Sequence, residues 1–248
     1  MDYVLIIVAA LIAGTMNAVA GGGSFLTFPA LVFIGVPPVV ANASSTVVLF
    51  PASFASAWAY RKDRKNFGDL GFKAMALMSV AGGTLGATLL LSLPETAFDF
   101  IIPWLLLVAT LAFAFGPYLR LKLQREIKLN APVFLAVQFV AAIYGGYFGG
   151  AVGLILLSFW GLSGFSDLRM LNANKTLLAG LMNAAAVVIF ISAGRVSWTE
   201  TLVMLAAAIT GGYFGARVAR RLNPRFVRAL ITVTSVVVTV AFFVRSYL

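Results

Sequence analysis

The chain has 248 residues, of which 61% are hydrophobic and only 10% are charged, and its formal net charge is +10. A soluble domain of this size would need far more polar residues to cover its surface, so the composition indicates an integral membrane protein. Cysteine and histidine are both absent, which excludes disulfides, thiolate metal sites and the side chain that most often carries protons at neutral pH. A zinc or redox enzyme is therefore not expected, and no metal or cofactor is predicted.

Ten apolar segments follow one another along the chain, each ended by charged residues, proline or glycine. In chain order they cover residues 3–20, 24–35, 39–60, 70–93, 97–119, 131–150, 154–164, 170–193, 199–219 and 224–247. A helix rises about 1.5 Å per residue, so the segments 24–35 and 154–164 reach only about 18 Å of a hydrocarbon core of about 30 Å. We predict an all-α integral membrane protein with eight full spans and two short, broken or re-entrant helices.

The two halves of the chain resemble each other at a constant offset, the one that relates Gly23 to Gly153. The same offset relates Asn42 to Asn172, Ala43 to Ala173 and Thr46 to Thr176, and after a slip of one position AGGTLGA at 81–87 matches TGGYFGA at 210–216. We predict a first repeat at 1–119, a basic cytoplasmic linker at 120–130 and a second repeat at 131–248. Long internal repeats of this kind are typical of secondary transporters.

Basic residues gather in three clusters. They are Arg61, Lys62, Arg64, Lys65 and Lys73; Arg120, Lys122, Arg125 and Lys128; and Arg217, Arg220, Arg221, Arg225 and Arg228. Because cytoplasmic loops collect Lys and Arg, all three clusters are predicted to lie on the cytoplasmic side of the cell (inner) membrane, and both termini are predicted to lie outside. Loop 61–69 is basic whereas its repeat mate near 194–200 is not, so the two repeats are predicted to be inverted. Topology and anionic lipid explain the basic surface, and no nucleic-acid partner is predicted.

The first short segment lies in NAVAGGGSFLTFPALVF, residues 17–33. A helix that ends inside a membrane leaves backbone groups unpaired, which is tolerated only where they face protein or a water-filled cavity. Gly21, Gly22 and Gly23 permit close backbone approach, and a helix that begins at Ser24 would present its N-terminal amides to an anion. The second half has a similar glycine cluster ahead of its short segment, namely Gly145, Gly146, Gly149, Gly150 and Gly153. The alternative is that these glycines only let helices pack closely.

Two polar stripes follow the breaks. At helical spacing the first contains Asn42, Ser45, Thr46, Ser53 and Ser56, and the second contains Asn172, Lys175, Thr176 and Asn183. Position 45 maps to 175, so one ammonium replaces a serine, and a lone cation among hydroxyls and amides suits a small anion. The alternatives are a lysine that extends to the headgroups and hydroxyls that only join helices. The predicted substrate-binding set is Asn17, Gly21, Gly22, Gly23, Ser24, Asn42, Ser45, Thr46, Gly150, Gly153, Asn172, Lys175, Thr176 and Asn183.

These motifs resemble the TauE/SafE sulfite-exporter family of bacterial and plant membrane transporters. The matching stretches are NAVAGGGSFLTFPAL, GVPPVVANASSTV followed by YRKDRK, GGYFGGAVG and NANKTLLAGLMNAAA. The resemblance implies a multi-pass permease that exports small sulfur-containing or carboxylated anions, such as sulfite, sulfoacetate or related organosulfonates. The second glycine cluster lacks the GGG run that many members have, which implies a less open second half-site.

Two other classes of protein remain as alternatives. An intramembrane enzyme with a serine nucleophile would have only Lys175 as its base, and a metalloenzyme lacks histidine and a buried carboxylate cluster. A membrane scaffold subunit would show no transport when purified alone. The eight acidic residues lie in or beside predicted loops, so obligate proton coupling has no evident carrier. The sequence leaves open which anion is carried, the direction and coupling of transport, and whether a homodimer forms.

Overall fold

The structure is a computed structural model and describes residues 2–19, 22–68, 70–122, 129–150, 152–219 and 224–247. Within these residues the elements are α1 (Asp2–Val19), α2 (Ser24–Phe33), α3 (Pro38–Ala59), the 3-10 turn η1 (Arg61–Asp63), α4 (Phe72–Ser92), α5 (Glu95–Lys122), α6 (Ala131–Tyr147), α7 (Val152–Leu162), α8 (Leu168–Ser192), α9 (Trp198–Ala219) and α10 (Pro224–Tyr247). The ten α-helices coincide with the ten predicted segments to within a few residues. The all-helical part of the fold prediction is therefore confirmed.

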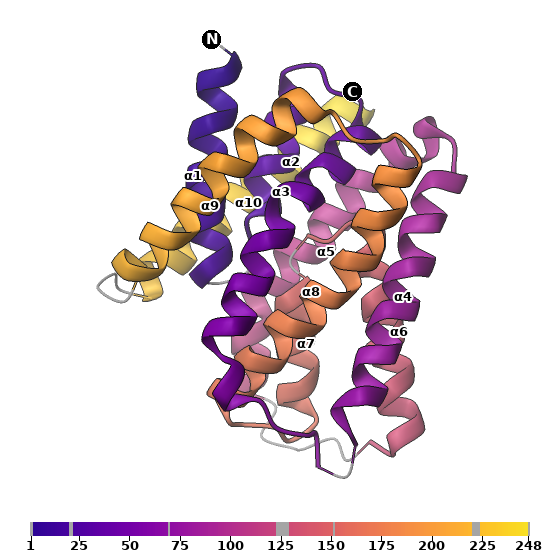
Figure 1. Cartoon of the computed structure of the whole chain (residues 1–248), viewed down its shortest axis with the longest axis vertical. Coiled ribbons are helices and arrows are strands. Elements are labelled where there is room, and N and C mark those ends of the chain that lie inside the picture. Colours follow the sequence, from indigo (N-terminus) through magenta and orange to yellow (C-terminus); the bar gives the residue numbers. More distant parts are fainter. Residues whose placement is uncertain are drawn as a thin grey trace.

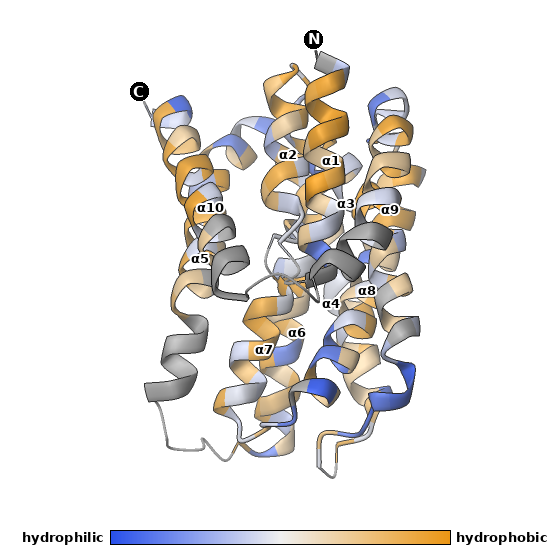
Figure 2. Cartoon of the chain, turned by 90° about the vertical axis from the view of Figure 1, so that its left-hand side faces the viewer, coloured by the Kyte–Doolittle hydropathy of each residue, from blue (hydrophilic) through white to orange (hydrophobic). Residues whose placement is uncertain are grey.

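The helices form an elongated bundle with both chain ends at the same end, the upper one in Figure 1. The short helix α2 lies in the upper half of the bundle and the short helix α7 in the lower half, as Figures 1 and 2 both show. The loop that contains η1 lies at the lower end. The bundle therefore has two distinct ends, and its short helices occupy opposite halves.

Among the described residues, four helices are long and apolar enough to cross a membrane, by length and composition. Their apolar windows are Pro38–Ala55, Phe72–Ser92, Glu95–Ala112 and Arg169–Ser192. Apolar residues also cover much of the length of α1 and α10 (Figure 2), and large exposed apolar surfaces of this kind are covered by lipid in a multi-pass membrane protein. The count of eight full spans stays a prediction, because the described apolar parts of the remaining helices are shorter.

The predicted linker at 120–130 begins inside a helix, because α5 continues to Lys122. Residues 123–128 lie outside the described residues. The boundaries of the two repeats therefore stay a prediction.

Glycines of the matched motifs AGGTLGA and TGGYFGA lie where helices pack most closely. A Cβ atom at Gly82 on α4 would lie 2.6 Å from the Cβ atom of Ala142 on α6, closer than two carbon atoms approach. On α9, a Cβ atom at Gly211 would overlap the backbone of Leu11 on α1. Close helix packing therefore accounts for these two motifs, which serve the pairs α4–α6 and α1–α9.

The loops at the two ends of the bundle are tied by contacts that cross between the halves of the sequence. At one end, the Ser197 backbone N–H donates to Ser44 Oγ of α3 at 2.9 Å. At the other, Asn174 Nδ2 of α8 donates to the Lys65 carbonyl oxygen at 2.8 Å. Ser44 and Asn174 are repeat mates, so equivalent positions of the two halves hold opposite loops.

Two ion pairs also cross between the halves. Lys65 pairs with Asp167 at 3.1 Å, and Arg195 pairs with Glu95 at 3.1 Å. Lys65 and Arg195 are again repeat mates. The pKa of Asp167 is lowered, first because its carboxylate accepts a hydrogen bond from the Met170 backbone N–H at the start of α8 and next because it accepts one from Lys65.

Candidate functional site

The two short helices α2 and α7 begin at the same cavity. Ser24, the first residue of α2, and Val152 and Gly153, the first two residues of α7, all line it, and its volume is about 60 Å³. Gly149 precedes α7 with a φ angle of +75°, a left-handed conformation that glycine adopts without steric cost. The chain can therefore leave α6 and enter α7 in the opposite direction, with the N-terminal end of α7 facing the cavity.

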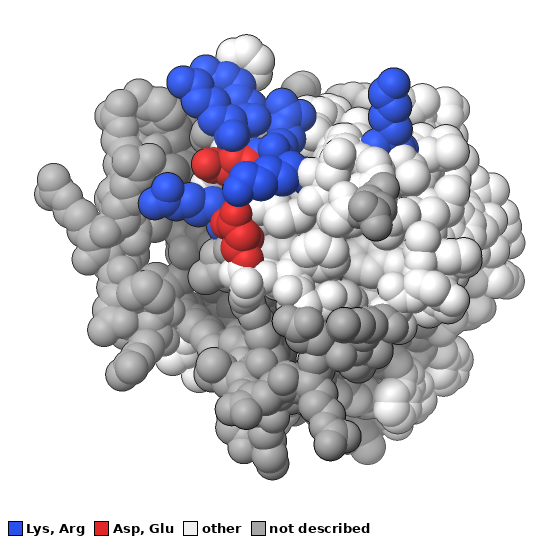
Figure 3. All heavy atoms as spheres, turned by 90° about the horizontal axis from the view of Figure 1, so that it is seen from below, with Lys and Arg blue, Asp and Glu red and all other residues white. Residues whose placement is uncertain are grey.

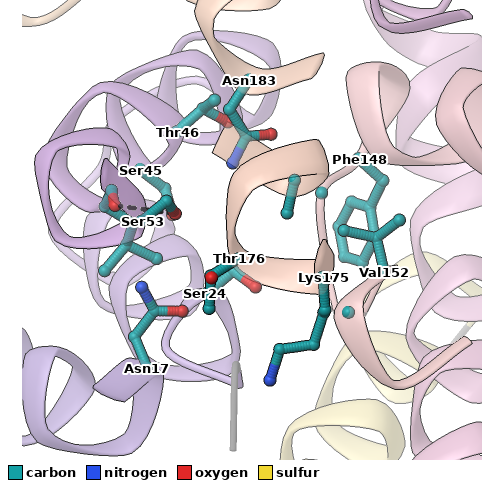
Figure 4. A pocket seen from close by; sticks show the side chains of 14 residues that line it. Asn17, Ser24, Ser45, Thr46, Ser53, Phe148, Val152, Lys175, Thr176 and Asn183 are labelled. Carbon is teal, nitrogen blue, oxygen red and sulfur yellow. Dashed lines mark hydrogen bonds between the residues drawn. The ribbon is translucent and has the colours of Figure 1, made fainter. Parts of the chain in front are cut away.

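The walls of the cavity come mainly from α3 and α8 (Figure 4). The residues that line it are Asn17, Ser24, Ser45, Thr46, Leu49, Ser53, Phe148, Gly149, Val152, Gly153, Lys175, Thr176, Ala179 and Asn183. Eight of the predicted substrate-binding residues are in this set, namely Asn17, Ser24, Ser45, Thr46, Gly153, Lys175, Thr176 and Asn183. The structure thus brings the polar stripes and the helix breaks together around one space.

Equivalent positions of the two halves face each other across this cavity. Both members of four pairs of repeat mates line it: Ser45 and Lys175, Thr46 and Thr176, Leu49 and Ala179, and Ser53 and Asn183. One member of each pair lies on α3 and the other on α8. Two of these pairs differ in chemistry, because the hydroxyls of Ser45 and Ser53 on α3 lie opposite the Lys175 ammonium and the Asn183 amide on α8.

Lys175 supplies a buried positive charge to the cavity. Its side chain is only 7% exposed, so protein encloses it, unlike a lysine that extends to the headgroups. Its stem packs on α7, because a Cβ atom at Gly153 would lie 3.0 Å from Lys175 Cδ. Among the residues that the structure describes, none forms a hydrogen bond or ion pair with this ammonium, and no carboxylate lines the cavity. The charge is therefore available to a ligand.

Most hydroxyl groups on the cavity wall already donate their protons to the protein. Thr46 Oγ1 donates to the Asn42 carbonyl oxygen at 2.9 Å, and Thr176 Oγ1 donates to the Asn172 carbonyl oxygen at 3.0 Å. Ser45 Oγ shares a hydrogen bond of 2.6 Å with Thr27 Oγ1. These side chains therefore stabilise the wall, and other groups must donate the hydrogen bonds to a ligand.

Three polar side chains on the cavity make no hydrogen bond to the described part of the chain. They are Asn17 of α1, Ser24 of α2 and Asn183 of α8, and the Oδ1 atom of Asn183 is buried without a partner. Buried polar groups are normally paired, so an unpaired amide on a cavity wall is available to a ligand. With Lys175 they form a set of free polar groups around one space (Figure 4).

Five of the predicted site residues that the structure describes lie elsewhere. Gly22, Gly23, Asn42, Gly150 and Asn172 do not line the cavity, and Gly21 lies outside the described residues. Asn42 Nδ2 donates to the Tyr147 carbonyl oxygen at 2.9 Å, at the last residue of α6. The Gly150 carbonyl oxygen accepts a hydrogen bond of 2.9 Å from the Tyr144 hydroxyl. These contacts shape the break between α6 and α7 and leave neither group facing a ligand.

The predicted set missed six residues that line the cavity, which are Leu49, Ser53, Phe148, Gly149, Val152 and Ala179. Ser53 was in the predicted polar stripe, and its offset from Asn183 could have placed it in the set. Leu49 lies one helical turn from Ser45 and from Ser53. Phe148 and Val152 offer no comparable signal, because their place depends on where α6 ends.

Residues 6–242 match the family described as Sulfite exporter TauE/SafE. "Probable membrane transporter protein ORF9" of a Sinorhizobium species is 30% identical over 236 residues, which are 94% of this chain and 89% of that protein. "Probable membrane transporter protein" of Haemophilus influenzae is 29% identical over 231 residues, 92% of this chain and 89% of that protein. "Probable membrane transporter protein YfcA" of Escherichia coli K12 is 29% identical over 231 residues, 93% of this chain and 85% of that protein.

No solved structure matches the chain. The family match nevertheless extends over nearly all of the described helices, from α1 to α10. The chain belongs to the TauE/SafE sulfite exporter family of membrane transporters.

Proposed function

We propose that this protein is a secondary transporter that binds a small anion, sulfite or an organosulfonate such as sulfoacetate, in the cavity where α2 and α7 begin. The observation that carries the proposal is Lys175, a buried ammonium without a counter-charge among the described residues. Burying an unpaired charge is costly, and an anion that accepts a charge-assisted hydrogen bond would offset that cost. The free side chains of Asn17, Ser24 and Asn183 would complete its coordination.

The size of the cavity supports a small ligand. Its volume of about 60 Å³ has room for about four to six water molecules. An oxyanion with three or four oxygens fits that space, whereas a large organic anion would need the walls to move. The N-terminal ends of α2 and α7 add backbone amides and dipoles that favour negative charge.

We further propose that the two halves of the chain are inverted repeats and that the cavity lies on the axis between them. In this relation α1 corresponds to α6, α2 to α7 and α4 to α9. The contact between α1 and α9 then corresponds to the contact between α6 and α4, and the contact between α1 and α2 corresponds to the contact between α6 and α7. The four facing pairs on α3 and α8 and the equivalent loop contacts of Ser44 and Asn174 support the same relation. Inverted repeats allow one site to open to either side of a membrane in turn.

Charge supports an inner-membrane orientation with both termini outside. Exposed Lys and Arg side chains gather at the lower end, away from the termini (Figure 3). Those described are Arg61, Lys62, Arg64, Lys65, Lys73 and Arg169. The positive-inside rule assigns this end to the cytoplasm.

The experiment is a measurement of sulfite and sulfoacetate binding to purified wild-type, Lys175→Gln and Lys175→Arg proteins, matched for folded amount. Loss of a charge-assisted hydrogen bond costs about 1.5–3 kcal/mol, so Gln should weaken binding about tenfold to a hundredfold. Arg should be only partly tolerated, because a planar fork does not replace a compact ammonium. The matched control is Lys73→Gln, an exposed lysine at the lower end of the bundle, which should leave binding unchanged.

Liposomes that contain only the purified protein test transport itself. If the wild-type protein transports sulfite or sulfoacetate and Lys175→Gln reduces this flux, the result would support the proposed transport function. Binding without flux would favour a scaffold subunit. Equal dissociation constants for Lys, Arg and Gln at position 175 would remove this residue from the site.

A further inference from the structure

A second cavity lies between the start of α5 and the end of α10, at the end of the bundle where both termini lie. Its volume is about 200 Å³, and Asp99, Phe100, Ile102, Phe242, Arg245 and Ser246 line it. The two helices are joined there by hydrogen bonds from Ser246 Oγ to the Asp99 carbonyl oxygen (3.1 Å) and from the Tyr247 hydroxyl to the Phe100 carbonyl oxygen (3.0 Å). The cavity is therefore a built feature of the α5–α10 pair.

This cavity lies at the head of a lipid-facing surface. Below it, α5 exposes Trp104, Val108 and Leu111, and α10 exposes Val240 and Val244. Large apolar side chains exposed along two packed helices of a membrane protein are covered by acyl chains.

Aromatic residues mark the depth of the cavity. Trp104 Nε1 donates to the Tyr247 hydroxyl at 2.9 Å, and the rings of Trp104 and Phe243 meet edge to face at 5.3 Å. Tryptophan and tyrosine are enriched where membrane meets water. The cavity beside them is therefore at the level of lipid headgroups.

Two opposite charges face this cavity without pairing with each other. Neither the Asp99 carboxylate nor the Arg245 guanidinium forms an ion pair or a side-chain hydrogen bond with the described residues. Arg245 instead lies over the Phe242 ring, 5.9 Å from its centroid. A ligand with one negative and one positive group can satisfy both side chains at once.

We propose that this cavity binds the headgroup of a zwitterionic phospholipid with a primary ammonium, that is, phosphatidylethanolamine. The Arg245 guanidinium matches the geometry of a phosphate, and a primary ammonium donates hydrogen bonds to the Asp99 carboxylate. A choline headgroup has no N–H to donate and binds best to open aromatic faces, whereas Arg245 already lies over Phe242. The acyl chains would then follow the exposed stripe that begins at Trp104.

Native mass spectrometry of the purified full chain, with lipids of matched acyl chains, tests this proposal. Phosphatidylethanolamine should bind at least about fivefold more tightly than phosphatidylcholine or phosphatidylglycerol, the scale of one net hydrogen bond. Asp99→Asn should abolish the preference for the ethanolamine headgroup over the choline headgroup, and Arg245→Gln should weaken the binding of all three lipids. The control is Arg195→Gln at the same end. Arg195 does not line the cavity, so this change should leave the binding of all three lipids unchanged.

Three results would overturn the assignment. The first is equal binding of the three lipids to the wild-type protein. The second is equally tight binding of glycerophosphoethanolamine, which has no acyl chains and would identify a soluble ligand. The third is an Arg245→Gln protein that changes its oligomeric state while it keeps all its lipids, since the cavity would then belong to a contact between protein chains.

Discussion

Replacing Asn183 by leucine should make the protein more stable and less able to bind its substrate. Asn183 lines the central cavity, and its Oδ1 atom is buried without a hydrogen-bond partner. Leucine has nearly the same shape and no polar atom, so Asn183→Leu removes the unpaired group without leaving a void. A polar group that destabilises the fold yet faces a cavity is expected where ligand binding requires it.

Asn183→Leu should therefore raise the stability of the fold and lower its affinity for the substrate. A buried polar atom without a partner costs about 1–3 kcal/mol, so we expect Asn183→Leu to raise the free energy of unfolding by about 1 kcal/mol, the lower end of that range. For a chain of this size that raises the melting temperature by about 2–4 °C. Loss of the hydrogen bond that Asn183 Nδ2 would donate to a bound anion should weaken binding by about 1.5 kcal/mol, or roughly tenfold.

Thermal unfolding in detergent and sulfite binding, measured on the same preparations, provide the test. The control is Gln138→Met, which removes an amide that is fully paired: Gln138 Nε2 donates to Ser79 Oγ at 3.0 Å and its Oε1 accepts from Trp160 Nε1 at 3.3 Å. This change should lower the melting temperature and leave binding unaltered. If Asn183→Leu also lowered the melting temperature and left sulfite affinity intact, Asn183 would be a structural residue and the reasoning would be wrong.

Three other parts of the structure can be tested in the same way. Gly83→Ala should lower the free energy of unfolding by an amount typical of overpacking, about 1–3 kcal/mol, because a Cβ atom there would lie 2.6 Å from the Met182 carbonyl oxygen; an unchanged melting temperature would contradict the close helix contact. The pKa of Asp167 is lowered by the hydrogen bonds its carboxylate accepts, so its stabilisation is present above the ordinary carboxylate pKa and lost as the pH falls through the lowered value. Asp167→Asn should therefore destabilise the protein at neutral pH but not in acid, and a difference that persists in acid would argue against the carboxylate. In sealed cells an impermeant thiol reagent should label Ser197→Cys but not Lys62→Cys, whereas the reverse pattern would invert the proposed orientation.

The sequence by itself determined the helices, their order and the two short segments. Apolar length and interruptions by charge, proline and glycine are local properties, and they predicted α2 and α7 nearly to the residue. The constant offset between the halves also predicted that Ser45 and Lys175 occupy equivalent places. It did so because both lie on helices whose spacing to the preceding break is the same in each half.

The glycines show where sequence reasoning became ambiguous. Gly149 adopts a φ angle of +75° and turns the chain at the cavity, whereas a Cβ atom at Gly146 would overlap the backbone of Gly83. Both belong to the same glycine cluster, and the pattern predicts a break and a close contact equally well. Only the packing of α6 on α4 separates the two roles.

The tertiary structure alone decided which polar side chains face the cavity. Asn42 and Ser45 share a helix face, yet Asn42 is used to hold the end of α6, where its amide meets the Tyr147 carbonyl oxygen. Phe148 joins the cavity from the predicted break between α6 and α7, but no local pattern indicates that its side chain lines the cavity. Helix periodicity places a residue on a face, but the neighbour on that face depends on contacts between segments far apart in the chain, and these are set by packing.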